Sequence, residues 1–372
     1  GAFLSGGLDS SAIVAYMSKV TSQSVKTFTI GYGQKDESFN ELKKAKIVAH
    51  HFGCEHNEYI LEPNISDILP ELVKHFDEPF ADSSALPTYL VSRVSKENVT
   101  VALTGIGGDE LFGGYPRYLG AKVSTIYQKI PISVRRMIAK ASSILPETGV
   151  SLDWLGRGKR FLLTGTQSLQ EQYKRWVSYI NSEFKNKFYT PVFSEKLLKQ
   201  NKQLKYNFDD QFSLLKDKKL ENIFKIDLKT YLVDDLLCMA DRMGMANSLE
   251  LRVPLCDVRI VEFFAKIPFT LKIKGFTLKY LFKKAMADIL PKEIIEQKKM
   301  GFMVPLRRWI AEEMDSLVEE YLSENTIIKR GYFNPEIVSW MIREHRLGRH
   351  NFADQIWSLL ILESWQKNYE DR

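Results

Sequence analysis

Cysteine is scarce in this sequence, and long apolar runs are missing from it. The 372 residues include three cysteines, Cys54, Cys238 and Cys256, which lie far apart and form neither a CxxC pair nor a Cys/His cluster. This spacing argues against a disulfide framework and a structural zinc site. No stretch approaches the roughly 18 consecutive apolar residues of a membrane helix, and the start does not read as a cleavable signal. We therefore expect a cytoplasmic protein without a membrane partner.

Neither sign of charge dominates the composition. Lys and Arg total 52 and Asp and Glu total 46, which leaves a formal net charge of +6. This excess is mild for a chain of this length, so it does not by itself indicate a nucleic-acid partner. A small ligand rich in phosphate fits the charge equally well. The 44% hydrophobic and 26% charged residues are typical of a globular protein rather than a disordered or collagen-like one.

The first 120 residues alternate between strand-like and helix-like runs. Period-two or continuous apolar patterns predict strands at residues 1–4, 25–31, 56–61 and 99–104. Helical spacing follows them at residues 12–17, 40–52, 64–77 and 84–96. Alternation of this kind is typical of a parallel sheet covered by helices on both faces.

The pattern changes beyond about Tyr118, where long amphipathic runs replace the strand, turn and helix units. We expect two parts, an α/β core over residues 1–120 with a doubly wound parallel sheet, and a largely helical portion over 121–372. The first strand begins at residue 1 with no turn or cap before it. This abrupt start leads us to expect that an amino-terminal portion precedes the chain.

The first glycine-rich turn, SGGLDSS at residues 5–11, joins the first strand to a helix. It is not a G-x-x-x-x-G-K-[ST] phosphate loop, yet its two glycines allow close backbone approach to a ligand. The helix start presents free N–H groups, and Ser5 and Ser10 add hydroxyl donors, so the turn suits a pyrophosphate group. Asp9 would repel that anion unless a cation intervenes, which favours a role as a Mg²⁺ ligand. A structural turn with capping side chains is the alternative.

A second turn with the same character follows the strand at 99–104. It has the sequence GIGGDELFGGY, residues 105–115, and opens a helix. Ligand sites of open parallel sheets lie beyond the carboxyl ends of the strands, so Asp9 and Asp109 are expected to face one cation. Glu110 also reads as an ordinary acidic residue of a first helical turn. No strand is followed by G-x-G-x-x-G, which argues against nicotinamide chemistry.

Five motifs in order resemble the synthetase domain of the glutamine-dependent asparagine synthetases. They are SGGLDSS at 5–11, GIGGDELFGGY at 105–115, YLVDDLL at 231–237, DRMGMANSLELRVPLCD at 241–257 and KKMGFMVPL at 298–306. The resemblance spans nearly the whole chain and implies the fold of the adenine nucleotide alpha-hydrolase or ATP-pyrophosphatase type. It also implies that residues 121–372 complete the acceptor site, so that both parts form one synthetase domain.

The resemblance implies a reaction in two steps. A substrate carboxylate attacks the α-phosphorus of ATP and releases pyrophosphate, and ammonia then displaces AMP from the acyl-adenylate. The family's ammonia comes from an amino-terminal glutaminase domain, which is expected upstream. By this resemblance Asp9 and Asp109 hold Mg²⁺, Asp9 also takes part in catalysis, and the nucleotide is bound by Leu4, Ser5, Gly6, Gly7, Asp9, Ser10, Ile30, Gly31, Thr104 and Gly105. Expected partners are aspartate or another carboxylate, with a homodimer also considered.

Two further catalytic residues are implied by the resemblance. Lys299 matches the family lysine that reaches the reacting phosphate, with its neighbour Lys298 as the rival. Glu250, near Arg252, lies in the segment that lines the acceptor side and is a candidate acid or base for the ammonia step. Asp82 either meets the nucleotide or acceptor or caps a loop, and the sequence leaves both open.

Ile106 is a departure from the family pattern. Well-known asparagine synthetases carry Glu or Asp at this place, and isoleucine can neither accept a proton nor hold an ammonium-like species. Either Glu110 or Glu250 takes over this role, or the protein amidates another carboxylate, such as a uronate of a surface polysaccharide. A catalytically silent nucleotide-binding homologue is a further alternative. An RNA-modifying ligase is another, which the carboxyl-terminal motifs do not favour.

Overall fold

The computed structural model describes residues 1–61, 65–143, 154–180, 182–201, 208–213, 220–297 and 304–371. The chain forms two units, of which unit 1 comprises Gly1–Asp77, Asp82–Tyr118 and Ile223–Pro305. Unit 2 comprises Glu78–Ala81, Leu119–Asn222 and Leu306–Arg372. This division differs from the expected split at residue 120, because the chain returns to unit 1 after residue 222.

Unit 1 is built on a parallel sheet with the strand order β3-β2-β1-β4-β5. The strands are β1 (Ala2–Phe3), β2 (Lys26–Tyr32), β3 (Glu55–Leu61), β4 (Val101–Leu103) and β5 (Glu250–Arg252). The central strand β1 is short, and its Ala2 pairs with Thr27 of β2 on one side and Leu103 of β4 on the other. The expected doubly wound parallel sheet is therefore confirmed.

The fifth strand corrects one expectation, since no strand was predicted beyond Tyr118. Its residues Glu250 and Leu251 pair with Val101 and Ala102 of β4 in parallel register. The strand has only three residues, and polar side chains flank a single leucine. So short an edge strand carries too little period-two pattern to be found in the sequence.

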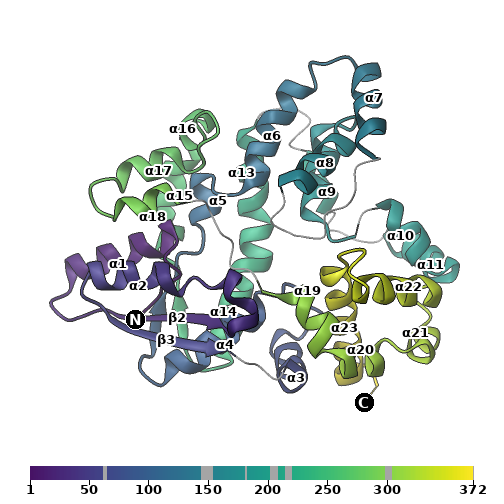
Figure 1. Ribbon diagram of the computed structural model, residues 1–372, viewed down its shortest axis with the longest axis horizontal. Coiled ribbons are helices and arrows are strands. Elements are labelled where there is room, and N and C mark those ends of the chain that lie inside the picture. The colour runs from purple at the N-terminus through teal and green to yellow at the C-terminus, as the bar shows by residue number, and fades with distance from the viewer. Residues whose placement is uncertain are drawn as a thin grey trace. The chain divides into compact units, whose positions relative to one another are not determined.

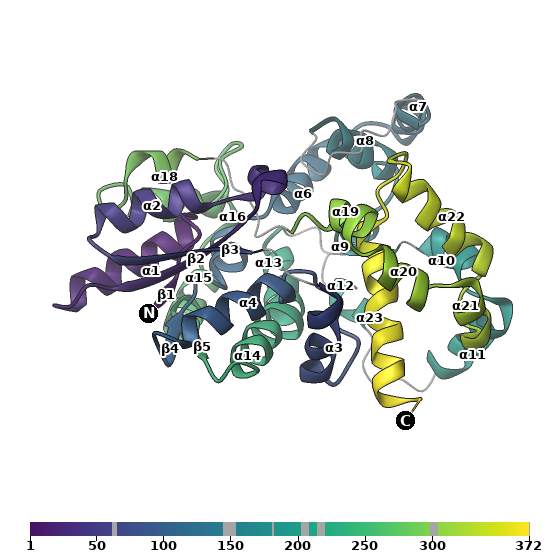
Figure 2. The same ribbon diagram turned by 60° about the horizontal axis from the view of Figure 1, so that its bottom comes forward.

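Helices cover both faces of this sheet, as the parallel arrangement requires. Figure 2 shows α1 (Leu8–Val20) and α2 (Leu42–His51) on one face and α4 (Ala85–Lys96) and α14 (Cys238–Met245) on the other. The remaining elements of the unit 1 segments are η1 (Gln34–Phe39), α3 (Ile65–Phe76), α5 (Gly108–Phe112), α13 (Glu221–Lys229), the π-helix η3 (Tyr231–Leu237), η4 (Pro254–Cys256), α15 (Val258–Ala265), α16 (Phe269–Lys272), α17 (Tyr280–Ala285) and α18 (Lys292–Glu296).

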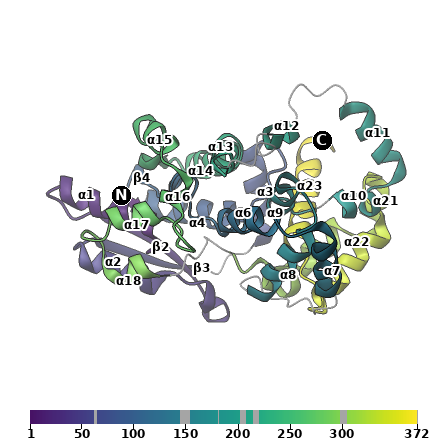
Figure 3. The ribbon, with the colours of Figure 1, turned by 90° about the horizontal axis from the view of Figure 1, so that it is seen from above.

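The main core of unit 1 lies on the α1 and α2 face of the sheet. Buried residues of α1 and α2 pack there against Phe282 of α17, Met286, Leu290 and Ile294 of α18. Figures 1 and 3 show α17 and α18 beside α1 and α2 accordingly. Because α17 and α18 come from far along the chain, this packing brings late residues to the two glycine-rich turns.

Unit 2 is helical in its described part, as the sequence led us to expect of the carboxyl-terminal portion. Its longest helix is α23 (Ala353–Tyr369), whose Trp357 and Leu360 are fully buried. The other elements are α6 (Pro116–Tyr127), which begins in unit 1, α7 (Ile132–Ser143), α8 (Trp154–Thr164), α9 (Leu169–Val177), α10 (Ser182–Phe188), α11 (Pro191–Asn201), α12 (Phe208–Phe212), α19 (Leu306–Arg308), the π-helix η5 (Trp309–Glu313), α20 (Asp315–Tyr321), α21 (Glu324–Arg330) and α22 (Pro335–Arg346).

Candidate active site at the carboxyl ends of β1 and β4

The two glycine-rich turns follow neighbouring strands, β1 and β4, in the middle of the sheet. The chain leaves β1 toward one side of the sheet and β4 toward the other, so the strand order reverses between them. In open parallel sheets, ligands bind at such a reversal, outside the carboxyl ends of the strands. The topology alone therefore marks this edge as the place of a ligand site.

The first turn is held by its own serines. The hydroxyls of Ser5 and Ser10 lie 3.0 Å apart, and the Ser10 hydroxyl also accepts a hydrogen bond from the Ser5 backbone N–H at 3.3 Å. The Gly7 N–H donates to Ser5 Oγ at 3.2 Å, and Ser10 Oγ donates to the Gly7 carbonyl at 3.2 Å. These bonds fix the backbone at the start of α1, where N–H groups suit a phosphate.

Gly6 lets the turn approach α2 closely. Its φ of +70° lies in the left-handed region, and a Cβ there would come within 2.6 Å of the backbone nitrogen of Ala45. A side chain is excluded on both grounds. The Gly6 carbonyl accepts a hydrogen bond of 2.7 Å from Gln297 Nε2. Gln297, which no sequence motif pointed to, thus holds the turn from just beyond α18.

The second turn packs directly against the start of α1. A Cβ on Gly105 would lie 2.8 Å from the Ser10 nitrogen and 2.9 Å from the Asp9 Cβ, and a Cβ on Gly108 would collide with the Asp9 carboxylate. Glycine is therefore required at both positions for the two turns to touch. This contact brings together the residues of both turns that the sequence assigned to one site.

Asp9 and Asp109 bind the same cation, the ammonium of Lys279. Lys279 Nζ forms an ion pair with Asp9 Oδ2 and a second one with Asp109 Oδ1, the latter at 2.6 Å. The side chains of both aspartates are largely buried, at 17% and 19% exposure. The expectation that the two carboxylates face one positive charge agrees with this arrangement, although the charge here belongs to the protein.

Lys279 is held in an unusual conformation and environment. It precedes α17, has a φ of +51°, and its side chain is 8% exposed. Burial by itself would lower the pKa of the ammonium group, but the carboxylates of Asp109 and Asp9 outweigh burial and raise it. A Cβ on Gly114 would collide with Asp109 and with Lys279 Cε, so this glycine makes room for the ion pair.

The donor set fits Mg²⁺ together with a phosphorylated ligand. Two carboxylates and one ammonium leave a net charge of −1 in a largely buried place, which attracts further positive charge. Within the described residues, no group of three or more His, Cys, Asp or Glu side chains is arranged to hold a metal. Mg²⁺ commonly takes one or two carboxylates and completes its shell with phosphate oxygens and water. Asp9 and Asp109 meet this requirement.

The other residues assigned to the nucleotide contribute backbone more than side chains. The side chains of Leu4 and Ile30 are 1% and 7% exposed and belong to the core. Thr104 is buried, and its Oγ1 accepts a 3.4 Å hydrogen bond from the Ile106 N–H. A Cβ on Gly31 would come within 2.8 Å of Asn40 Oδ1, so the chain after β2 lies tightly over it.

Glu250 lies apart from the two turns. It is the first residue of β5, and it is exposed. Its Oε1 accepts a 2.7 Å hydrogen bond from Nε of Arg252, the last residue of the strand. Because β5 is parallel to β4, the carboxyl end at Arg252 is the one beside the second turn. The structure thus brings Arg252, rather than Glu250, to the ligand edge of the sheet.

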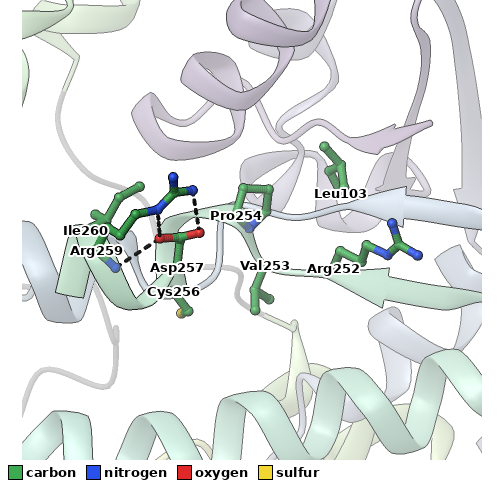
Figure 4. A pocket seen from close by; sticks show the side chains of 8 residues that line it. All are labelled: Leu103, Arg252, Val253, Pro254, Cys256, Asp257, Arg259 and Ile260. Atoms are coloured by element: carbon green, nitrogen blue, oxygen red, sulfur yellow. Dashed lines mark hydrogen bonds and ion pairs between the residues drawn. The ribbon is translucent and has the colours of Figure 1, made fainter. Parts of the chain in front are cut away.

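Arg252 lines an open pocket of about 770 Å³ at the carboxyl ends of β4 and β5. Figure 4 shows Arg252 at one end of the lining and Arg259 at the other, with Pro254 and Val253 between them. Arg259 is bound to Asp257 through two hydrogen bonds from its guanidinium. Cys256 also lines the pocket, and its Sγ donates to the Ile106 carbonyl at 3.7 Å, so the pocket borders the second turn.

Glu110 is the buried acid of the second turn. It is 1% exposed, and its Oε1 accepts a hydrogen bond from the Tyr115 hydroxyl. Burial, with the neighbouring charge of Asp109, raises the pKa of its carboxyl to about 7. Of the two acids considered as substitutes for the family acid at Ile106, Glu110 is the one that adjoins Asp109.

The sequence also assigned possible roles to Lys299 and Asp82. Lys299 and its rival Lys298 lie outside the described residues, between Gln297 and Val304. Asp82 precedes α4, and its Oδ1 accepts hydrogen bonds from the Ser84 backbone N–H at 2.8 Å and the Ser84 hydroxyl at 2.6 Å. Asp82 therefore caps the loop before α4 through Oδ1. Its Oδ2 takes no part in these two hydrogen bonds.

Comparison with known proteins agrees with this geometry. The asparagine synthase family model matches residues 1–367. The chain belongs to the asparagine synthase family. Asparagine synthetase [glutamine-hydrolyzing] 1 of Bacillus subtilis (strain 168) is 35% identical over 377 residues, which cover 100% of this chain and 56% of the relative. The family resemblance inferred from the five motifs is therefore confirmed.

Other asparagine synthetases extend the comparison. A putative asparagine synthetase [glutamine-hydrolyzing] of Mycobacterium tuberculosis (strain ATCC 25618 / H37Rv) is 32% identical over 98% of this chain and 54% of its own length. The asparagine synthetase [glutamine-hydrolyzing] of Gallus gallus is 26% identical over 96% of this chain and 51% of its own. The chain thus spans about half the length of the curated relatives it matches. The asparagine synthase family is a family of ATP-using ligases.

None of the helices in the described ranges combines the length and the apolar character that crossing a bilayer requires.

Proposed function

We propose that the chain catalyses the ATP-dependent amidation of a carboxylate, with aspartate as acceptor, asparagine as product and glutamine-derived ammonia as nitrogen source. A carboxylate oxygen forms a bond to the α-phosphorus of ATP, and the bond to the bridging oxygen of pyrophosphate breaks. The nitrogen of ammonia then bonds to the acyl carbon, the bond to AMP breaks, and the nitrogen gives up a proton. Adenylation thereby turns a poor electrophile into a good one.

The shared binding of one cation by Asp9 and Asp109 is the observation that carries this proposal. A phosphate-cleaving site needs carboxylates that hold a metal against phosphate oxygens, beside backbone N–H groups that receive the anion. Both lie here at the reversal of strand order, and family membership points to the same chemistry. When bound, Mg²⁺ stabilises the negative charge on the departing pyrophosphate.

The remaining residues bind and orient. The start of α1 supplies backbone N–H groups and the hydroxyls of Ser5 and Ser10 for the pyrophosphate part of ATP. Lys279 holds Asp9 and Asp109 at a common position through its two ion pairs. Arg252, at the carboxyl end of β5, is suited by its guanidinium to bind an acceptor carboxylate. Lys299 is proposed to reach the reacting phosphate, in keeping with its place in the family motif.

Release of AMP and pyrophosphate across a panel of carboxylic acids tests this function, with ammonium chloride as nitrogen donor. The proposal requires both products to depend on ATP, Mg²⁺ and aspartate, with asparagine formed in the same amount as AMP. Binding of ATP without any acceptor-dependent AMP would favour the catalytically silent homologue instead. Ammonia as donor makes the test independent of any glutaminase domain.

A different acceptor is the second candidate, favoured by two observations. Ile106 offers no carboxylate where the family carries one, and the pocket beside it is open and therefore sets no tight limit on the size of the acceptor. A bulkier carboxylate such as a uronate fits both. Uronates therefore belong in the same panel, and efficient amidation of aspartate alone would dismiss this candidate.

A further inference from the structure

Three carboxylates of unit 1 gather beside the second turn, and we call Asp82, Glu110 and Asp235 the acid cluster. They come from three elements: Asp82 precedes α4, Glu110 belongs to α5, and Asp235 lies in the π-helix η3. Burial raises the pKa of Asp235 most, and Asp82 and Glu110 lie close enough for their charges to raise it further. Convergence of three acids from distant segments is costly unless a positive charge or a proton compensates them.

Two oxygens of the acid cluster lie buried without a hydrogen-bond donor. Glu110 is 1% exposed, and its Oε2 has no partner among the described residues, whereas its Oε1 is bound by Tyr115. Asp235 Oδ1 is buried in the same way and likewise has no partner there. Buried carboxylate oxygens are nearly always hydrogen-bonded in folded proteins. Two unpartnered ones in a single cluster indicate a place for a ligand that donates hydrogens.

Arg117, whose charge lowers the pKa of Asp235, is bound to another acid. Arg117 donates from Nε and Nη2 to Asp227 Oδ2, at 3.1 Å and 2.8 Å. Its guanidinium packs on the ring faces of Tyr115 and Tyr231, at 3.9 Å and 4.8 Å from their centres. Asp227 thus already pairs with Arg117, and no Lys or Arg of the described residues forms an ion pair with the acid cluster. Burial, and then the neighbouring Asp82, raise the pKa of Asp235, as expected where carboxylates lack a cation.

The arrangement suits an organic cation better than a metal ion. Within the described residues no three acidic, histidine or cysteine side chains are close enough together to coordinate a metal. A primary ammonium group has three N–H donors and reaches oxygens at hydrogen-bond distance, so it tolerates a wider spacing. The proposed reaction uses one such group, the amine of an amino-acid acceptor, and the ammonium ion that supplies the nitrogen offers the same kind of N–H donor.

We propose that the acid cluster binds a primary ammonium group next to the second turn, through the unpartnered oxygens of Glu110 and Asp235. This inference rests on the proposed function for the identity of the ligand. Glu110 directly follows Asp109, so the bound amine is adjacent to the phosphate-binding edge. The π-helix η3 places Tyr231 and Asp235 on this side, and π-helical segments occur frequently at functional sites. No bond is made or broken in this step.

The test compares Asp235→Asn and Asp82→Asn, which preserve side-chain size, with Asp234→Asn as a matched control. Asp234 is the exposed neighbour in the same π-helix. Two Michaelis constants are measured, one for aspartate in ATP–pyrophosphate exchange without ammonia, and one for ammonium in AMP release at saturating aspartate. If the acceptor's amine is the ligand, the Michaelis constant for aspartate rises about tenfold in the cluster variants. If ammonium is the ligand, the Michaelis constant for ammonium rises by about the same factor.

Either rise supports the site, and the control is expected to change neither constant. Values within about twofold of wild type for both constants would overturn the proposal, including the case in which kcat alone falls. Succinate, which is aspartate without its amino group, gives an independent readout. If the acceptor's amine is bound, the preference for aspartate over succinate shrinks in Asp235→Asn. Should Asp235→Asn fail to fold, Asp82→Asn carries the same test.

A binding measurement separates failure of this site from failure of the proposed function. The melting temperature of the wild-type protein is recorded with ammonium chloride against sodium chloride, and with aspartate against succinate, at equal ionic strength. Stabilisation by either ammonium-bearing compound that disappears in Asp235→Asn supports the site even if no AMP is formed. Equal shifts in wild type and both cluster variants would overturn it even if the enzyme is active.

Discussion

Asp9 and Asp109 come from different strands of the sheet and yet bind one and the same ammonium group, that of Lys279. Two turns make this meeting possible, because Gly105 and Gly108 let the second turn lie against the first residues of α1. The pair therefore defines a preformed cation site at the reversal of strand order. Its chemistry depends on what replaces or joins Lys279 when a phosphorylated ligand binds.

Replacing Lys279 with methionine tests whether the two carboxylates form a cation site. The variant leaves two buried charges uncompensated, so its free energy of unfolding is expected to fall by about 3–5 kcal/mol. Mg²⁺ should then raise the melting temperature of Lys279→Met more than that of wild type, because the ion can take the empty place. Thermal unfolding with and without Mg²⁺ measures both effects. Equal Mg²⁺ shifts in the two proteins would speak against a metal site at Asp9 and Asp109.

The glycine contact between the turns is tested by Gly108→Ala. A methyl group there collides with the Asp9 carboxylate, so Asp9 must move and activity should fall by about a hundredfold. Gly158→Ala is the matched control, since that helical position has open space around it. The control is expected to keep full activity and gain about 0.5–1 kcal/mol of stability. Full activity of Gly108→Ala would show that the position of Asp9 is not critical.

Lys299 and Lys298 form a natural pair of test and control. Family resemblance assigns the reacting phosphate to Lys299, so Lys299→Ala should lose about a hundredfold or more in the rate of pyrophosphate release. Lys298→Ala should retain the wild-type rate. Single-turnover release of pyrophosphate distinguishes the two variants. The reverse pattern would transfer the role to Lys298, and two active variants would remove it from both.

The carboxyl group of Asp235 is expected to make the stability of the fold depend on pH. Its pKa in the folded protein lies above the usual aspartate value of about 4, chiefly through burial and next through Asp82, while Arg117 opposes the rise. The protonated form therefore stabilises the fold, fully below about pH 4, and this contribution is lost as pH rises through the folded-state pKa. Asp235→Asn has no carboxyl group at this position, so it lacks this dependence of stability on pH. The melting temperature of the variant relative to wild type should increase from acidic to alkaline pH, and a constant difference would contradict this assignment.

Much of the fold and of the phosphate edge could be predicted from sequence because local signals were strong there. The glycine-rich sequences at residues 5–11 and 105–115 mark turns that connect a strand to a helix. In a parallel sheet, turns of this kind lie at the same edge of the sheet. Asp9 and Asp109 follow from that placement alone. The predicted helix at 84–96 differs from α4 by one residue at its start, and the predicted strand at 25–31 differs from β2 by one residue at each end.

Other features left no local trace. Lys279 is a lone lysine before a short helix, and its meeting with the turns depends on the packing of α17 and α18 against α1, a long-range effect. The return of residues 223–305 to unit 1 is of the same kind. The acid cluster could not be found either, because Asp82, Glu110 and Asp235 belong to separate segments and converge through tertiary structure.

The shared cation site is tested most directly by the activity of Asp9→Asn and Asp109→Asn. The quantity measured is the rate of Mg²⁺-dependent cleavage of ATP to AMP and pyrophosphate in the presence of aspartate and ammonium. Asp288→Asn, an exposed position of unit 1, is the control. Both site variants should lose about a hundredfold or more in rate while the control stays at the wild-type rate. Full activity of Asp9→Asn would contradict the shared cation site on which the proposed reaction depends.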